Sequence, residues 1–283
     1  MNFEKKITII IVIHDCTSLI FDCLKHLDHF DIIIVDNMKN NKIIDKLKNY
    51  KNISIITKNK NLGFGNAINF ATENIKTEFF LVLNPDIVIS EENIFKIYET
   101  INKFQNCAIA APINIPDEDS YGIFPEKRNL YEKNKNLIDH SKIDIPEDEI
   151  CVDVTKGCAL LINTKFFKEV GGFSKEYFLF WEEIDLCKKF RKTGYSVIVN
   201  PNSIAKHNQG SSSENSLINY FLRSYHNELS PLIYFNIDKK NLRLYKNIFK
   251  YLFRSFSYFF ILNIKGSVRN ISKLSANIKY ILK

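Results

Sequence analysis

Apolar, β-branched runs alternate with helix-like segments over the first 110 residues, and few folds accommodate that order. Strands are predicted on the apolar runs at residues 7–13, 31–35, 53–56 and 79–83. Helices are predicted between and after them, opening at Thr17 and spanning residues 43–47, 64–74 and 91–104. Short connections between alternating strands and helices favour a mostly parallel sheet with helices on both faces. We therefore predict an α/β fold.

The predicted strands end on polar residues that can bind a ligand. Ile13-His14 closes the first strand, Asp36-Asn37 the second, and Asn84-Pro85-Asp86 the fourth. The carboxyl ends of parallel strands share one edge of a sheet, where open α/β proteins bind their ligands. The Asp86 carboxylate is a hard oxygen ligand, which suits Mg²⁺ or Mn²⁺ holding a diphosphate. Ordinary turns are the alternative, because Asn, Pro and Asp are all favoured there.

Three further motifs carry candidate site residues. Asn61-Leu62-Gly63-Phe64-Gly65-Asn66 places two glycines before a helix, where backbone amides can approach a phosphate or sugar. Trp181-Glu182-Glu183-Ile184-Asp185 clusters three carboxylates at a helix start. Lys206-His207-Asn208 follows a strand predicted over residues 195–199 and offers an imidazole to a metal. A helix-entry turn, helix capping and a surface histidine are the respective structural alternatives.

The second half of the chain is less regular. Further strands are predicted at residues 152–154 and 159–162, and helices at residues 164–170 and 183–193. Residues 112–150 are polar and show no periodicity. A segment of that length predicts a lid or substrate-binding excursion, or else disorder.

The cysteines and the apolar runs indicate the cellular compartment of the protein. Six cysteines without C-x-x-C spacing indicate buried thiols in a reducing compartment. The run over residues 7–13 lacks the cleavage site of a signal peptide. No run reaches the roughly 18 to 20 apolar residues of a membrane span. We expect a cytoplasmic protein.

The net charge of +7 is located at the end of the chain. Residues 239–283 contain eleven basic and no acidic side chains, whereas the other 238 residues carry 28 basic and 32 acidic ones. From Asn241 onward, aromatic and basic residues fall on different faces of a predicted amphipathic helix. We expect this tail to lie on an anionic membrane surface, with packing on its own domain or on a second subunit of a homodimer as the alternative. Nucleic acid is not expected, since the rest of the chain is net acidic.

The order of these motifs resembles that of the inverting family 2 glycosyltransferases with the GT-A fold, and most closely their rhamnosyltransferase-like branch. The motifs that carry the resemblance are Val35-Asp36-Asn37, Asn61 to Ala67, Leu83-Asn84-Pro85-Asp86, Lys156-Gly157-Cys158-Ala159, Val170-Gly171-Gly172-Phe173, Phe178 to Leu186 and His207 to Ser212. They extend over residues 7 to about 213. The resemblance implies a transferase domain over residues 1–235, with a nucleotide-sugar part (1–110) and an acceptor part (111–235), followed by the basic helical tail (236–283).

The resemblance also implies roles for single residues. Asp86 and His207 match the metal-binding residues, Asp36 contacts the nucleotide base, and Glu183 matches the general base. The family usually has Glu-Asp where this chain has Glu182-Glu183, and Thr-Tyr-Asn where it has Ile13-His14-Asp15. Glu182 and Asp185 are expected to orient the acceptor or the base, with capping as the alternative. Trp181 is expected to be an acceptor platform or part of the core.

The implied reaction is an inverting, metal-dependent sugar transfer. The donor would be bound by Ile13, His14, Asp36, Asn37, Asn61, Gly63, Gly65, Asn66, Asn84, Asp86 and Gly157, with Mg²⁺ or Mn²⁺ as cofactor. The leading donor is dTDP-L-rhamnose, with a UDP-hexose or UDP-N-acetylhexosamine as the alternative. A glycan or lipid-linked acceptor of bacterial surface polysaccharide synthesis is expected. A catalytically impaired nucleotide-sugar-binding protein and a membrane scaffold are the alternatives from other classes.

Overall fold

The computed structural model describes residues 3–14, 18–38, 43–58, 60–116, 121–122, 147–208 and 216–283. The chain divides into two compact units. The first, called the sheet unit, comprises Met1–Glu126, Lys135–Lys175 and Glu182–Ser213. The second, called the helical unit, comprises Lys127–Asn134, Glu176–Trp181 and Glu214–Lys283.

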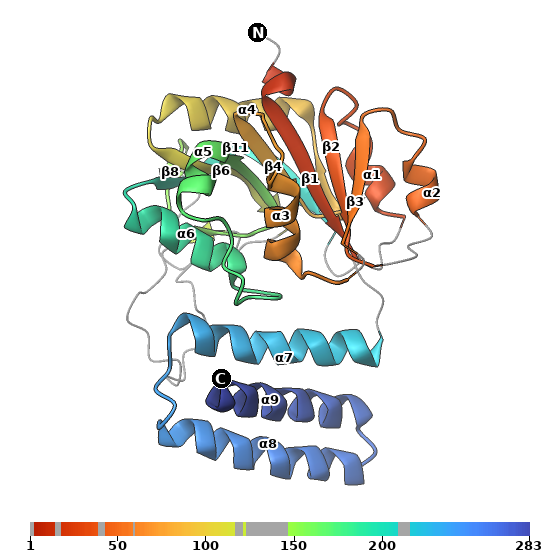
Figure 1. Cartoon of the computed structure of the whole chain (residues 1–283), viewed down its shortest axis with the longest axis vertical. Helices are drawn as coiled ribbons and strands as arrows, with labels where there is room; N and C mark the ends of the chain where they lie inside the picture. The colour runs from red at the N-terminus through yellow and green to blue at the C-terminus, as the bar shows by residue number, and fades with distance from the viewer. Residues whose placement is uncertain are drawn as a thin grey trace. The chain divides into compact units, whose positions relative to one another are not determined.

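The sheet unit is built on one large sheet (Figure 1). Its nine strands follow the order β3-β2-β1-β4-β10-β6-β11-β5, with β8 paired to β11. Their bounds are β1 Ile7–Ile13, β2 Asp31–Asp36, β3 Ile53–Thr57, β4 Phe79–Leu83, β5 Ile87–Ile89, β6 Cys107–Ile115, β8 Ile150–Cys151, β10 Ala159–Asn163 and β11 Ser196–His207. A two-stranded sheet joins β7 Tyr121–Gly122 to β9 Val154–Thr155.

The pairing confirms a mostly parallel sheet. Strands β1, β2, β3, β4, β6 and β11 run in one direction, and only β5, β8 and β10 oppose them in the part of the chain that is described. Ile13 pairs with Asp36, and Leu83 pairs with Ile11. The carboxyl ends of β1, β2 and β4 therefore meet at one edge. Antiparallel β10 begins at that same edge, because Ala159 pairs with Leu83.

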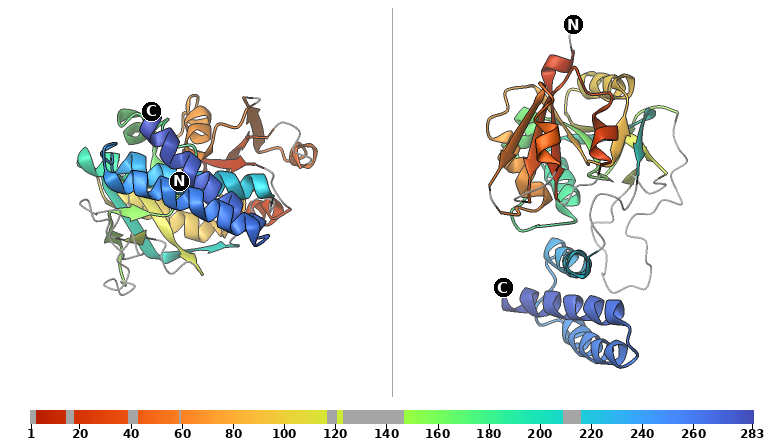
Figure 2. Two further views of the ribbon diagram at one scale, coloured as in Figure 1. Left: turned by 90° about the horizontal axis from the view of Figure 1, so that it is seen from below. Right: turned by 90° about the vertical axis from the view of Figure 1, so that its right-hand side faces the viewer.

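Helices cover both faces of this sheet (Figure 2). Their bounds are α1 Ile20–Leu24, α2 Ile44–Leu47, α3 Phe64–Thr72, α4 Glu91–Lys103, α5 Thr164–Glu169 and α6 Glu182–Lys192. Ile9 and Ile11 of β1 share one core cluster with Ile94 of α4. On the opposite face, Phe80 of β4 packs edge-on against Phe167 of α5, with ring centroids 5.0 Å apart. Burial on both faces explains why β1 and β4 are uninterrupted apolar runs.

Several elements of the sheet unit differ from the sequence prediction. The helix expected to open at Thr17 begins at Ile20, and Thr17 itself lies outside the described residues. Strands β5 and β6 were not predicted. The strand expected over residues 195–199 continues to His207, because irregular pairing between Asn200 and Ile204 lets it pass Pro201. His207 therefore lies in the strand and not after it. Most of the irregular segment 112–150 falls outside the described residues.

The helical unit confirms a helical tail, but this tail forms two helices where one amphipathic helix was predicted, and the helix that precedes it was not predicted. It contains α7 Leu217–Tyr234, α8 Leu242–Phe260 and α9 Ile264–Leu282, and α9 packs against both α7 and α8 (Figure 1). Leu232, Leu244 and Tyr280, one from each helix, form its small core. The boundary drawn from the sequence at residues 235–236 falls inside this unit, between α7 and α8.

Candidate active site

Asn37 joins the first two strand ends to the glycine-containing loop. Its backbone N–H donates to the Ile13 carbonyl at 2.9 Å, and its side-chain Nδ2 donates to the Gly63 carbonyl at 3.0 Å. Its Oδ1 accepts a hydrogen bond from the Leu62 N–H at 3.2 Å. The structure thus brings together three of the expected nucleotide-sugar residues, Ile13, Asn37 and Gly63. Asn37 itself is buried, and both its Nδ2 and its Oδ1 form hydrogen bonds within this junction.

Asp36 lies beside Asn37 at the end of β2 and is also buried. Burial raises the pKa of its carboxyl, while a 3.0 Å hydrogen bond from the Met38 N–H and the charge of His14 act in the opposite direction. His14 and Asp36 are therefore close enough to interact, as expected for two residues of one binding edge. A carboxylate held by a backbone amide is an acceptor in fixed geometry for a base or ribose hydroxyl.

The two glycines of the loop before α3 have different roles. Gly63 has φ +76°, a left-handed conformation that favours glycine, and it caps the N-terminus of α3. Gly65 packs against Phe173, because a Cβ added there would lie 2.9 Å from the Phe173 Cβ. The Asn66 side chain donates to the Leu62 carbonyl at 3.2 Å. Gly65 thus has a packing role that the sequence motif did not reveal.

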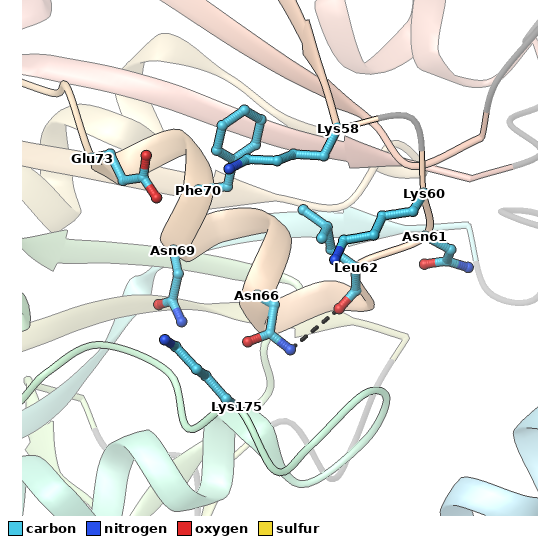
Figure 3. A pocket seen from close by; sticks show the side chains of 9 residues that line it. All are labelled: Lys58, Lys60, Asn61, Leu62, Asn66, Asn69, Phe70, Glu73 and Lys175. Carbon is cyan, nitrogen blue, oxygen red and sulfur yellow. Dashed lines mark hydrogen bonds between the residues drawn. The ribbon is translucent and has the colours of Figure 1, made fainter.

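A cavity of about 470 Å³ adjoins this loop (Figure 3). Asn61 and Asn66 of the expected donor site contribute to its wall. Its cationic side chains are Lys58, Lys60 and Lys175, against one carboxylate, Glu73. This excess of positive charge suits a phosphorylated ligand. The three lysines were not predicted as site residues, because single lysines in a lysine-rich chain carry no spacing signal.

Asp86 and His207 are brought together from positions 121 residues apart. Strands β5 and β11 pair with His207 opposite Ile87, and the Asn208 N–H donates to the Asp86 carbonyl at 3.0 Å. As a result, the Asp86 Oδ1 lies 3.7 Å from the His207 Nε2. The Asp86 side chain is only 2% exposed. Residues 209–212 of the histidine motif lie outside the described residues.

This pair fits a divalent metal whose remaining ligands come from elsewhere. A carboxylate oxygen and an imidazole nitrogen are suitable ligands for Mn²⁺. Among the described residues, no group of three or more His, Cys, Asp or Glu side chains is placed to hold a metal. Two protein ligands leave coordination positions for diphosphate oxygens and water, which is how Mg²⁺ and similar ions bind in phosphate-transfer sites.

A chain of contacts connects the Asp86 loop to the acidic start of α6. The Asn84 N–H donates to the Cys158 carbonyl at 2.9 Å. The preceding residue, Gly157, faces Glu183, since a Cβ on Gly157 would lie 3.2 Å from the Glu183 Cβ. The expected general base is thus placed at the same edge of the sheet as the expected metal ligands.

The two glutamates at the start of α6 have different environments. Glu182 is 5% exposed, and its Oε2 has no hydrogen-bond partner among the described residues. Burial, together with the charge of Glu183, raises the pKa of Glu182 well above its usual value. Burial also raises the pKa of Glu183, opposed by the backbone N–H groups of Glu183 and Ile184 and by the charge of Lys156. Glu183 keeps partial surface exposure.

Asp185 and Trp181 flank this pair. The Asp185 Oδ2 lies 3.7 Å from the Lys189 Nζ one helical turn later. Trp181 is 7% exposed and packs against Tyr234 and Phe235 within the helical unit, with centroids 5.2 and 5.5 Å away. This burial favours the core alternative that the sequence left open for Trp181. Phe180 and Trp181 both have positive φ, a strain that often accompanies functional sites.

Lys156 is a further residue that the sequence did not single out as functional. Its charge lowers the pKa of Glu183 against the effect of burial. No local signal could have revealed this, because the interaction depends on the packing of α6 against the loop before β10. Lys156 does, however, directly precede Gly157 in the motif that carried the resemblance.

The fold and the site define a class, the GT-A-type glycosyltransferases. Residues 8–169 match the family model "Glycosyl transferase family 2". The chain belongs to glycosyltransferase family 2.

The individual relatives share low sequence identity with this chain. Rhamnosyltransferase WbbL of Escherichia coli K12 is 25% identical, over 66% of this chain and 77% of the relative. The low-salt glycan biosynthesis hexosyltransferase Agl10 of Haloferax volcanii is also 25% identical, over 59% of this chain, which spans about half (55%) of that relative. The crystal structure of GalNAc-T7 with UDP, GalNAc and Mn²⁺ matches with a TM-score of 0.58 at 16% identity, over 71% of this chain and 43% of the other. That last likeness establishes the fold alone.

Proposed function

We propose that this protein transfers a sugar, with inversion, from a nucleotide-diphosphate sugar to an acceptor hydroxyl. The observation that carries the proposal is the placement of Glu183 at the sheet edge that also presents the Asp86–His207 pair, 3.7 Å apart. A general base and a pair of residues that can bind a metal diphosphate are the two groups that a single displacement needs.

Glu183 acts as the general base in this mechanism. Its carboxylate accepts the proton of the acceptor hydroxyl as the hydroxyl oxygen forms a bond to the anomeric carbon. The bond from that carbon to the diphosphate oxygen breaks, and the nucleotide diphosphate leaves with the bonding electrons. Attack from the face opposite the leaving group inverts the anomeric centre. A base whose pKa is raised by burial holds the proton more strongly at neutral pH than an exposed glutamate does.

Asp86 and His207 would hold a divalent cation against the donor diphosphate. When bound, such a cation neutralises negative charge that develops on the leaving group. The structure fits this role because Asp86 is a buried carboxylate held against an imidazole, with no third protein ligand among the described residues. We propose Mn²⁺ or Mg²⁺.

The donor base and sugar are assigned to the other strand ends. We propose that Asp36 binds the base or ribose, with Ile13, His14 and Asn37 shaping the same edge. The loop residues Asn61, Gly63 and Asn66, with Asn84 and Gly157, complete the donor site. dTDP-L-rhamnose is our leading donor, supported by the similarity to a rhamnosyltransferase. We propose a glycan or lipid-linked acceptor, supported by the similarity to a relative named N-acetylglucosaminyl-diphospho-decaprenol L-rhamnosyltransferase.

Thermal unfolding in the presence of dTDP-, UDP- and GDP-sugars, each with Mn²⁺ or with EDTA, tests the proposal. A donor present at 100 times its Kd should add about 2.7 kcal/mol to the free energy of unfolding. We expect a shift with dTDP-L-rhamnose and Mn²⁺ that EDTA removes, followed by release of dTDP when a lipid-linked acceptor is added. The absence of a shift with every donor, in a folded protein, would contradict a competent donor site.

A further inference from the structure

Helix α8 exposes its most apolar side to solvent. Phe249, Phe253, Phe256 and Phe260 recur at spacings of four, three and four residues and are between 58% and 79% exposed. These four side chains are called the phenylalanine face below. The opposite side of α8, which is buried, consists of Leu244, Tyr251 and Ser255. A helix that only had to pack on its own protein would bury its phenylalanines, because each removes a large apolar area from water.

Polar contacts hold α8 in this rotation. Glu228 of α7 accepts hydrogen bonds at its Oε1 from the Tyr251 hydroxyl of α8, at 3.0 Å, and from the Asn277 Nδ2 of α9, at 3.1 Å. Its Oε2 lies 3.3 Å from the Lys273 Nζ. The Ser267 hydroxyl of α9 donates to the Ser255 carbonyl at 3.0 Å. Turning the phenylalanine face inward would break the contacts of Tyr251 and Ser255 and leave Glu228 with its two partners on α9 alone.

A row of cations lies beside the phenylalanine face. Arg243, Lys246, Lys250 and Arg254 recur at spacings of three, four and four residues, and all four are exposed. No acidic residue occurs between positions 239 and 283. The exposed surface of α8 therefore combines an apolar face with a row of cations.

The apolar surface continues past the end of α8. Ile261, Leu262 and Ile264 form the turn into α9 and are all largely exposed, with Leu262 at 86%. Exposed apolar patches of this extent on a folded protein mark a binding surface.

We propose that the phenylalanine face and the turn at Ile261–Ile264 bind the surface of an anionic lipid bilayer. The rings enter the boundary between headgroups and acyl chains, and α8 lies along the membrane plane. The flanking lysines and arginines extend to the anionic headgroups, which attract basic side chains close to the surface. None of the helices in the described ranges is long and apolar enough to cross a bilayer.

Charge complementarity decides between a bilayer and a second copy of this chain. Two copies that pair through the same face of α8 would bring the rows Arg243–Arg254 of both copies together. The tail offers no carboxylate to neutralise them, since residues 239–283 are without acidic side chains. An anionic bilayer supplies both the apolar phase and the opposite charge.

Flotation of the full-length protein with vesicles tests this surface. We expect recovery with phosphatidylglycerol–phosphatidylcholine vesicles, and recovery that falls with pure phosphatidylcholine or in high salt. Replacing Lys246, Lys250 and Arg254 by Gln should lower the partition coefficient about 100-fold, because each cation near the surface contributes about fivefold. The triple change Phe253→Ser, Phe256→Ser and Phe260→Ser should abolish flotation.

Two controls keep the test independent of folding and of catalysis. Ile218→Ser removes an apolar side chain that is 73% exposed on α7 and should leave flotation unchanged. The Glu183→Gln variant, which the proposed function expects to be inactive, should float like the wild type. Failure of the wild type to float with anionic vesicles overturns the proposal. So does a wild-type dimer, measured by light scattering, that the triple serine variant converts to a monomer without any lipid binding.

Discussion

Gly157 lies against the side chain of Glu183, so closely that a Cβ added to Gly157 would be 3.2 Å from the Glu183 Cβ and 3.4 Å from its Cγ. These distances are shorter than ordinary carbon contacts, which begin at about 3.5 Å. The absence of a side chain at Gly157 therefore determines the position that the Glu183 side chain can occupy. In sequence, Gly157 and Glu183 are simply members of two separate motifs.

The substitution Gly157→Ala should move the Glu183 carboxylate by a few tenths of an ångström. Because a misplacement of about 1 Å can reduce the rate by on the order of 100-fold, we expect kcat to fall several-fold to about tenfold. The donor Kd should change much less, since the added methyl group points at Glu183. Steady-state kinetics and donor-induced thermal shifts measure the two effects. An equal loss of donor affinity and kcat would show that the methyl group acts through the donor site, to which Gly157 is also assigned, and not through Glu183.

Glu183→Gln should abolish transfer, because an amide cannot accept the proton of the acceptor hydroxyl. General base catalysis contributes typically 10²- to 10⁴-fold, so we expect a loss of at least about 100-fold. Burial raises the pKa of Glu183, and only its deprotonated form is active. The wild-type rate should therefore fall as the pH drops below the pKa of Glu183, which lies above the pKa of an ordinary glutamate. The residual rate of the variant should not show this fall at low pH.

The donor-dependent thermal shift is the control for this variant. With dTDP-L-rhamnose and Mn²⁺, the thermal shift of the Glu183→Gln variant should match the thermal shift of the wild type. If the Gln variant loses donor binding along with transfer, Glu183 is not the base.

Asp86→Asn should remove the metal dependence of donor binding. The substitution keeps the size of the side chain but deletes the charge that faces the His207 Nε2 at 3.7 Å. We expect the Mn²⁺-dependent thermal shift to vanish and kcat/KM to fall by at least about 100-fold, the effect of losing several kcal/mol of charge stabilisation. Calorimetric titration of Mn²⁺ in the presence of nucleotide diphosphate measures the binding step directly.

His207→Gln provides a second variant at the same pair. It should weaken Mn²⁺ binding less than Asp86→Asn does, because the carboxylate remains. Unchanged metal affinity in both variants would place the metal elsewhere.

The sheet edge could be predicted from the sequence because its determinants are local. β1 and β4 are continuous apolar runs, and their bounds Ile7–Ile13 and Phe79–Leu83 agree with the prediction. Once the strands are parallel, their carboxyl ends must share one edge, so Asp36 and Asp86 follow from topology alone. The cap of α4 is equally local, since the Ser90 hydroxyl accepts a hydrogen bond from the Asn93 N–H three residues later.

What could not be predicted depends on contacts that are distant in sequence. β6 contains several alanines and Pro112, a weak strand pattern, and it becomes a strand because β10 and β11 pair with its two edges. The packing role of Gly65 exists only because Phe173 folds onto α3. The raised pKa of Glu182 and Glu183 likewise reflects burial that no local motif records.

Glu182→Gln should stabilise the sheet unit above about pH 5. Glu182 is buried, and its pKa is raised well above its usual value. Between the unfolded pKa, about 4.3, and the raised folded pKa, the folded protein keeps a proton that the unfolded chain has lost. The free energy of unfolding of the wild type therefore falls as the pH rises through this window. Glutamine is neutral at every pH, so the free energy of unfolding of the variant should not fall in this way.

Thermal unfolding from pH 5 to pH 8 measures the difference. We expect the Tm of Glu182→Gln to exceed that of the wild type at pH 8 by about 2–4 °C for each kcal/mol gained, and the gap to narrow toward pH 5. Glu182→Asp retains a carboxyl group and should keep the decline with pH. A wild-type Tm that rises between pH 5 and pH 8 to the same extent as that of the Gln variant would mean that Glu182 is ionised in the folded protein.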